Sequence, residues 1–167
     1  MSTGLARLFA CGDVMPGRGI DQILPHPGDP ELREEYMRDA NGYVRLAERA
    51  HGPIPRPVSF SWPWGDALPL LEESAPAVRV INLETSVTRS AGFVPGKAVH
   101  YRMNPDNLPC VSVVRPDVCA LANNHVLDFG QPGAGRDARL PGRCRATGGR
   151  SRAGPGPGPA PGGRPAP

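Results

Sequence analysis

Three short apolar runs along the chain predict buried β-strands. They cover residues 8–11, 78–81 and 118–121, and valine or other apolar side chains dominate each of them. Each run stops abruptly at polar residues, beginning with Gly12-Asp13 after the first run. The pattern therefore predicts three strands that each end in a polar loop.

The segments between these runs have the spacing of helices. We predict helices over residues 31–39, 43–50, 66–74 and 105–114. Asp29 and Pro30 provide a capping residue and a first-turn proline for the first of them. In 43–50 the apolar side chains recur every three or four positions. Helices that alternate with apolar strands predict an α/β fold with largely parallel strands.

The amino-acid composition changes at about residue 131. Residues 132–167 include ten glycines, eight prolines and seven arginines, and Leu140 is their only large aliphatic side chain. Such a segment cannot supply a hydrophobic core, and we predict a Gly/Pro/Arg-rich disordered tail. Two explanations of the tail stay open: a basic arm for polyanions, or coding sequence translated out of frame.

The positive charge of the chain comes from this tail. The whole chain has a formal net charge of +3, whereas residues 1–131 contain 12 basic and 15 acidic side chains. This distribution excludes a uniformly basic nucleic-acid-binding domain. The tail also has no aromatic residue on which bases could stack. Nucleic acid is therefore not an expected partner.

The sequence gives no sign of a membrane span or a secretion signal. No stretch approaches the roughly 18 consecutive apolar residues of a spanning helix. Residues 1–10 contain one arginine and no long apolar region. We expect a cytoplasmic or peripherally membrane-associated protein.

Candidate chemistry lies where the three predicted strands end. Carboxyl ends of parallel strands share one edge of a sheet, so residues far apart in the sequence would meet there. Carboxylate and amide oxygens with one imidazole suit Mg²⁺, Mn²⁺, iron or Zn²⁺. The residues concerned are Asp13, Asn82, Glu84, Asn123, Asn124 and His125.

Each of these residues also has a simpler interpretation. Asp13 can be a turn residue after Gly12, Glu84 can cap the next element, and a lone histidine is more often structural than catalytic. The placement of all of them at three strand ends favours a site.

Three motifs then identify a family resemblance. They are Gly-Asp-Val-Met-Pro-Gly-Arg at 12–18, Asn-Leu-Glu-Thr at 82–85 and Ala-Asn-Asn-His-Val-Leu-Asp-Phe-Gly at 122–130. Together with segments 64–68 and 97–102, they resemble the CapA family of poly-γ-glutamate capsule synthesis, in the calcineurin-like metallophosphoesterase superfamily. The resemblance covers residues 5–131, which we interpret as the N-terminal part of such a domain.

The resemblance implies a fold and a metal centre. The fold would be a metallophosphoesterase-like β-sandwich flanked by helices, with two divalent ions (Mn, Fe, Zn or Mg) at the strand ends. Asp13 would bind the first metal, Glu84 with Asn82 would lie near the bridging position, and Asn124 would bind the second. Two cations can clamp the attacking and leaving oxygens of a phosphoryl group.

The resemblance also implies catalytic and substrate-binding roles. His125 would protonate the leaving group or hold a phosphoryl oxygen, and Asp128 would orient His125. Arg18 and Asn123 would contact the substrate, which we expect to contain phosphate or to be related to poly-γ-glutamate. Alternatively, Arg18 is a solvated surface side chain and Asp128 caps a turn. The capsule synthesis machinery would be the partner.

Two departures from the superfamily pattern affect the expected activity. Met15 occupies the position of a histidine that many members have, and no histidine follows His125. We therefore expect an incomplete phosphoesterase site in a truncated chain, a fragment of a CapA-like protein. The alternatives are a non-catalytic binding or assembly component that retains the fold, or an inactive gene relic.

Overall fold

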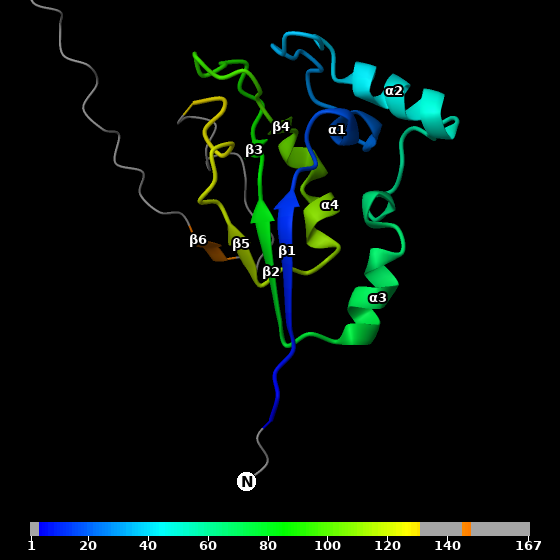
Figure 1. Cartoon of the computed structure of the whole chain (residues 1–167), viewed down its shortest axis with the longest axis vertical. Helices are drawn as coiled ribbons and strands as arrows, with labels where there is room; N and C mark the ends of the chain where they lie inside the picture. The colour runs from blue at the N-terminus through cyan, green and yellow to red at the C-terminus, as the bar shows by residue number, and fades with distance from the viewer. Residues whose placement is uncertain (1–3, 131–144, 148–167) are drawn as a thin grey trace, which may run out of the picture.

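The computed structural model describes residues 4–130 and 145–147 (Figure 1). Their main feature is a parallel four-stranded sheet in the order β1-β2-β5-β6. The strands are β1 (Leu8–Val14), β2 (Val78–Leu83), β5 (Val118–Ala120) and β6 (Arg145–Thr147). The predicted α/β class, with an open parallel sheet, is thus confirmed.

The three apolar runs form the strands expected of them. Leu8 pairs with Val78 in the β1–β2 ladder, and Val80 pairs with Val118 in the β2–β5 ladder. A second, two-stranded parallel sheet joins β3 (Ser86–Val87) to β4 (Arg102–Met103). The apolar runs do not predict this small sheet, because each of its strands has only two residues.

The segment predicted to be a disordered tail lies mostly outside the described residues. Only β6 is described in it, and it pairs in parallel with β5, Val118 opposite Arg145. The chain beyond β5 therefore contributes one short strand to the main sheet.

Helices alternate with the strands. They are α1 (Gly19–Ile23), α2 (Asn41–His51), α3 (Ala67–Ser74) and α4 (Pro109–Ser112), with single 3₁₀ turns η1 (Trp62–Trp64) and η2 (Pro105–Asn107). The helices predicted over 43–50 and 66–74 are confirmed. The one predicted over 105–114 is two short pieces, because Pro109 starts a new helix at its first position. None of the described helices is long and apolar enough to cross a membrane.

The helix predicted over 31–39 is wrong. This segment is an irregular loop closed by a bridge between Glu31 and Asp39 and by a bond from the Leu32 amide to the Arg38 carbonyl. The Asp29 side chain accepts from the amide only two residues ahead, which makes a turn instead of a helix cap. The loop also buries Glu34 against other polar groups, a tertiary contact that local spacing cannot reveal.

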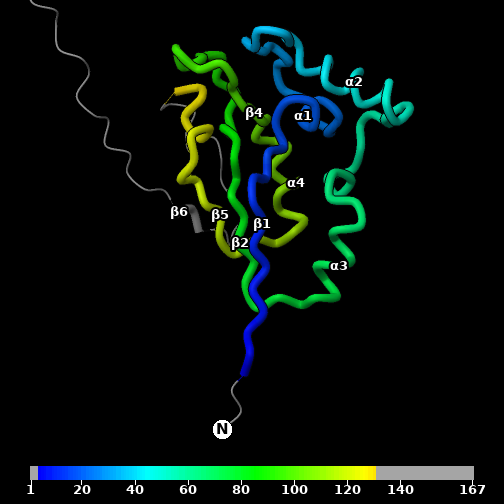
Figure 2. Tube along the Cα trace, in the orientation of Figure 1, coloured from blue at the N-terminus to red at the C-terminus, as the bar shows by residue number. Residues whose placement is uncertain are grey.

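The hydrophobic core covers one face of the main sheet. Ile81, Leu83 and Cys119 point from the strands into a cluster with Val111 of α4 and Met103 of β4. In Figures 1 and 2, α1, α3 and α4 lie on the β1 side of the main sheet, to the right in this view. The carboxyl ends of β1 and β2 point toward α1, β3 and β4. This end of the sheet carries the polar motifs.

Candidate functional site

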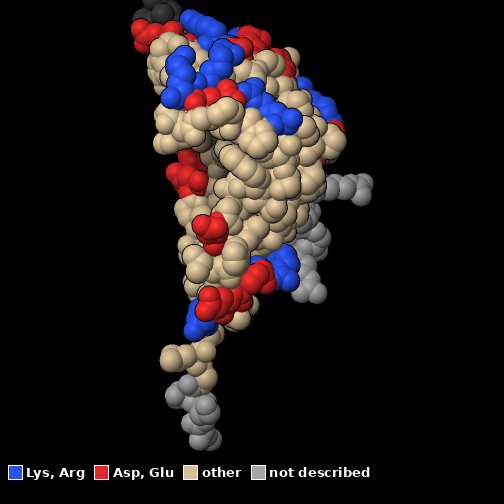
Figure 3. Space-filling model, turned by 90° about the vertical axis from the view of Figure 1, so that its right-hand side faces the viewer, with Lys and Arg blue, Asp and Glu red and all other residues tan. Residues whose placement is uncertain are grey.

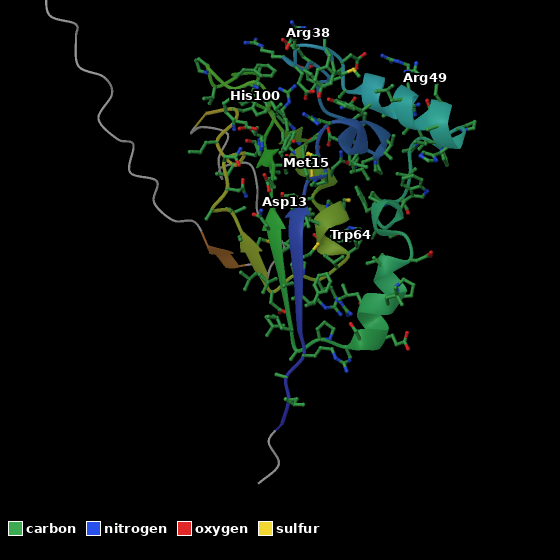
Figure 4. All side chains as sticks on the ribbon, in the orientation of Figure 1. Asp13, Met15, Arg38, Arg49, Trp64 and His100 are labelled. Carbon is green, nitrogen blue, oxygen red and sulfur yellow. The ribbon has the colours of Figure 1, made fainter. Side chains whose placement is uncertain are left out.

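The predicted strand-end residues meet in one hydrogen-bonded network. The side-chain Nδ2 of Asn82 donates to Asp13 Oδ1 at 2.8 Å and to Glu84 Oε2 at 3.0 Å. Asn123 Nδ2 donates in turn to Asn82 Oδ1 at 3.0 Å. The ends of β1 and β2 and the loop after β5 are therefore joined through side chains (Asp13 is labelled in Figure 4).

A bulge at Gly12 places Asp13 in this network. Cys11 pairs with Ile81, but Asp13 pairs with Asn82, so Gly12 is an extra residue in β1. If Gly12 instead paired regularly with Asn82, strict alternation would put Asp13 opposite Leu83, on the face that packs into the core. The bulge turns the carboxylate onto the Asn82 face, as bulges near functional sites commonly do.

Asp13 and Glu84 form a carboxylate pair. Hydrogen bonds from Glu84 and Asn82 hold the pKa of Asp13 below its ordinary value. The pKa of Glu84 is raised, first by its hydrogen bond with Asp13 and then by burial and the neighbouring charge. Two neighbouring carboxylates whose pKa values are shifted apart in this way offer a position where a cation would relieve their repulsion.

Asn123 holds the network together. Its Nδ2 also donates to the Leu83 carbonyl at 3.0 Å, and its Oδ1 accepts from the amides of His125 and Val126, each at 3.1 Å. Both ends of the amide are thus occupied within the protein, which gives Asn123 a positioning role. Its contact with a substrate stays a prediction.

His125 is held by a buried carboxylate. Its Nδ1 lies 2.7 Å from Asp128 Oδ2, and Asp128 is fully buried. Asp128 also accepts from the Tyr101 amide at 2.7 Å and from Lys97 Nζ. The other ring nitrogen, Nε2, lies 3.9 Å from Glu84 Oε1. The geometry fits the predicted orienting role of Asp128, and His125 meets the carboxylate pair.

The ring of Tyr101 contacts both His125 and Arg18. The His125 ring is stacked on Tyr101 with centroids 3.9 Å apart, and Arg18 Cζ lies 4.5 Å from the Tyr101 centroid. Arg18 Nη2 also pairs with Glu34 Oε1 at 2.6 Å. The Arg18 side chain is only 16% exposed, so it is not a solvated surface arginine. Its contact with substrate stays a prediction.

Asn124 is the predicted ligand that the network leaves out. Asn124 is exposed, and its side chain makes no hydrogen bond within the described residues. Only its carbonyl is engaged, as the acceptor of a bond from Lys97 Nζ. The structure therefore brings together all the predicted metal ligands except Asn124.

Lys97, Tyr101 and Glu34 belong to the site but were assigned no role from the sequence. Segment 97–102 is part of the family resemblance, and that was the available signal for Lys97 and Tyr101. Nothing in the sequence indicates that Glu34 is buried at the site, because the spacing of its segment predicts a helix. Glu34 is 1% exposed and accepts a bond from Tyr43; burial, and after it this bond, raises the pKa of Tyr43.

The donor chemistry fits one divalent cation better than two. Asp13 and Glu84 supply carboxylate oxygens of the kind that Mg²⁺ and Mn²⁺ prefer. Among the described residues, however, no group of three or more histidine, cysteine, aspartate or glutamate side chains could hold a metal ion. The remaining ligands would be amide oxygens and water.

Comparisons with known proteins agree with the motifs. The family model for the bacterial capsule synthesis protein PGA_cap matches residues 7–140. A "Probable polyglutamine synthesis accessory protein" of Mycobacterium tuberculosis strain CDC 1551 / Oshkosh, and one of the same name in strain H37Rv, are each 64% identical over 122 residues. No solved structure gives a significant match.

The matched region covers 73% of this chain but 32% of each relative, so the chain spans about a third of the length of these proteins. The family match itself extends over most of the described sheet and over every residue of the site. The chain belongs to the PGA_cap family of bacterial capsule synthesis proteins.

Proposed function

We propose that this chain carries part of a metal-dependent phosphoesterase-type site that serves capsule or polyglutamate synthesis. The carboxylate pair Asp13–Glu84, with His125 beside it, is the observation that supports this proposal. Glu84 Oε1 lies 3.9 Å from His125 Nε2. In this proposal an acid, a base and a cation would meet at one sheet edge, as phosphoryl chemistry requires.

Asp13 and Glu84 would hold the cation, with Asn82 beside them and Asn124 as a further amide ligand. A bound Mg²⁺ or Mn²⁺ would polarise a phosphoryl oxygen and neutralise its charge. The hydrogen bonds from Asn82 keep both carboxylates in place at 2.8 and 3.0 Å. In the complete domain we expect this parallel sheet to form part of a metallophosphoesterase-like β-sandwich.

The chain's other residues would handle the proton and the substrate. Asp128 fixes the Nδ1 side of the His125 ring, which leaves Nε2 directed toward the carboxylates. In that orientation His125 can donate a proton to a leaving oxygen or hold a phosphoryl oxygen. Arg18 contacts the Tyr101 ring, on which His125 is also stacked. The guanidinium of Arg18 would attract the anionic part of a substrate.

A non-catalytic accessory component is the second candidate. Two findings favour it: the relatives' name, "accessory protein", and the lack of a group of three or more ionisable ligands in the described part of the chain. Such a component would keep the fold and one weak cation site.

Titration calorimetry with Mn²⁺ and Zn²⁺, combined with hydrolysis of an aryl phosphate, tests both candidates. The enzyme predicts cation binding that Asp13→Asn weakens, and turnover that Asp13→Asn and His125→Gln each reduce by at least about 10²-fold, the usual size of an acid–base contribution. The control is Asp106→Asn, which lies outside the hydrogen-bonded network in an exposed pair with Arg89. One weak site without turnover would support the accessory role, and equal binding in Asp13→Asn would refute both.

A further inference from the structure

Two cavities lie next to α1 and η1, and the smaller of them reaches Asp13 of the carboxylate pair. The smaller, of about 230 Å³, is lined by Asp13, Met15, Ile20, Trp64 and Cys110 among others. The larger, of about 380 Å³, lies between α1, α2 and η1. Its volume is within the range of small-molecule sites.

The cavities are neighbours that share two walls. Met15 and Ile20 line both of them, and the 3₁₀ turn η1 contributes Trp62 to the larger and Trp64 to the smaller. Figure 4 shows Asp13 at the end of β1, Met15 just beyond it, and Trp64 on the helical side. The cavities therefore lead from the carboxylate site toward α2.

The lining of the two cavities is mainly apolar, and its charged residues are Asp13 in the smaller cavity and Arg18 in the larger. Arg18 is the single charged residue of the larger cavity, and its buried Nε has no hydrogen-bond partner in the described structure. Its backbone has a φ of 51°, which non-glycine residues rarely adopt. Such strain is typical of ligand sites. In Figure 3, which views the helical side, charged side chains gather at the two ends and leave much of the middle uncharged.

We propose that these cavities bind the aliphatic part of a phosphate ester whose phosphate lies at the Asp13–Glu84–His125 site. This inference rests on the proposed function and adds the substrate class: an alkyl phosphate instead of a free phosphate or a fully polar one. The apolar walls take the chain, and Asp13 stands where the smaller cavity meets the polar network.

Tryptophan fluorescence provides a direct measurement, because the only two tryptophans of the chain line the two cavities. The probes are hexyl phosphate, inorganic phosphate and hexanol, each titrated in the presence of Mn²⁺. Burial of several methylenes predicts that hexyl phosphate binds at least about tenfold more tightly than inorganic phosphate. It should also bind more tightly than hexanol, which lacks the phosphate. Equal affinity for hexyl phosphate and either other probe would overturn the proposal.

A matched pair of variants localises the binding. Ala47 lines the larger cavity from α2, whereas Ala50 is exposed on the same helix. Ala47→Phe should weaken hexyl phosphate binding at least about tenfold and leave inorganic phosphate unchanged, and Ala50→Phe should change neither. Ala47→Leu fills less space and should give an intermediate loss, which keeps the test available if the larger side chain prevents folding. Equal effects of Ala47→Phe and Ala50→Phe would overturn the proposal.

Asp13→Asn, together with an assay of hydrolysis, separates this inference from the proposed function. If both hold, the variant weakens hexyl phosphate and inorganic phosphate alike, and the ratio of their affinities persists. If only the proposed function fails, hexyl phosphate keeps its advantage and its sensitivity to Asp13→Asn and Ala47→Phe, but it is not hydrolysed. If only this inference fails, inorganic phosphate remains sensitive to Asp13→Asn and the hexyl chain gives no advantage.

Discussion

The imidazole ring of His125 lies against the phenol ring of Tyr101, with centroids 3.9 Å apart and an angle of 24° between the planes. The Tyr101 amide also donates to Asp128, the carboxylate that holds His125. Backbone and side chain of one residue thus fix the same imidazole from two directions. Segment 97–102 is therefore a structural part of the site, although it supplies no predicted ligand.

Two replacements of Tyr101 test the contributions of its ring and of its hydroxyl separately. Tyr101→Phe retains the stack and should leave the free energy of unfolding within about 0.5 kcal/mol of the original. Tyr101→Leu removes the ring contact and should cost about 0.5–1.5 kcal/mol. Urea denaturation measures both, and the ring-proton NMR shifts of His125 report the stack directly. Identical His125 shifts in the two variants would contradict the arrangement.

Asp128→Asn should destabilise the chain. The buried carboxylate accepts from His125, the Tyr101 amide and Lys97, and an amide cannot satisfy all three donors. Since hydrogen bonds to charged groups contribute about 1.5–3 kcal/mol, we expect a loss of about 2–3 kcal/mol in urea denaturation. The control is Asp106→Asn, whose ion pair with Arg89 is more than half exposed and should contribute little. A loss equal to that control would refute the role of Asp128.

Divalent cations should stabilise the chain through Asp13 and Glu84. A cation at about 100 times its Kd adds about 2.7 kcal/mol if it binds only the folded state. We expect Mn²⁺ to raise the midpoint of thermal unfolding and a chelator to reverse the rise. Glu84→Gln should abolish the increment, and Glu72→Gln, an exposed carboxylate beside Arg115, should preserve it. The prediction fails if Glu84→Gln still responds to Mn²⁺.

Cys110 should react slowly with alkylating reagents. Burial, and secondarily the charge of Asp21, raises the pKa of the Cys110 thiol to about 11, and the residue is 2% exposed. At pH 8 only about one molecule in a thousand would carry the reactive thiolate. Its labelling rate should rise about tenfold between pH 8 and pH 9, because the thiolate fraction rises by that factor below the pKa. Mass mapping after brief treatment with iodoacetamide measures it, with half-buried Cys11 as the internal comparison.

The sequence allowed the sheet to be predicted better than its surroundings. Apolar runs are local signals, so the strands and the polar residues after them could be placed from the chain alone. The loop over 31–39 could not, because Glu34 is drawn inward by Arg18 and Tyr43 from other elements. Tyr101 illustrates the same limit: stacking on His125 depends on a fold that brings residues 24 positions apart into contact.

The extra residue at Gly12 has a consequence for variation in this strand. A Cβ at Gly12 would meet no atom within 4 Å, so many side chains fit there and substitutions should be tolerated. Deletion of Gly12 would remove the bulge and leave Asp13 directly after Cys11, so regular alternation would keep Asp13 opposite Asn82 and off the core face that Leu83 occupies. Homologues that keep Asp13 opposite Asn82 are therefore expected to vary at this position both in the identity of the residue and in its presence. The pairing of Asp13 with Asn82, and not the number of residues before Asp13, is what selection would preserve.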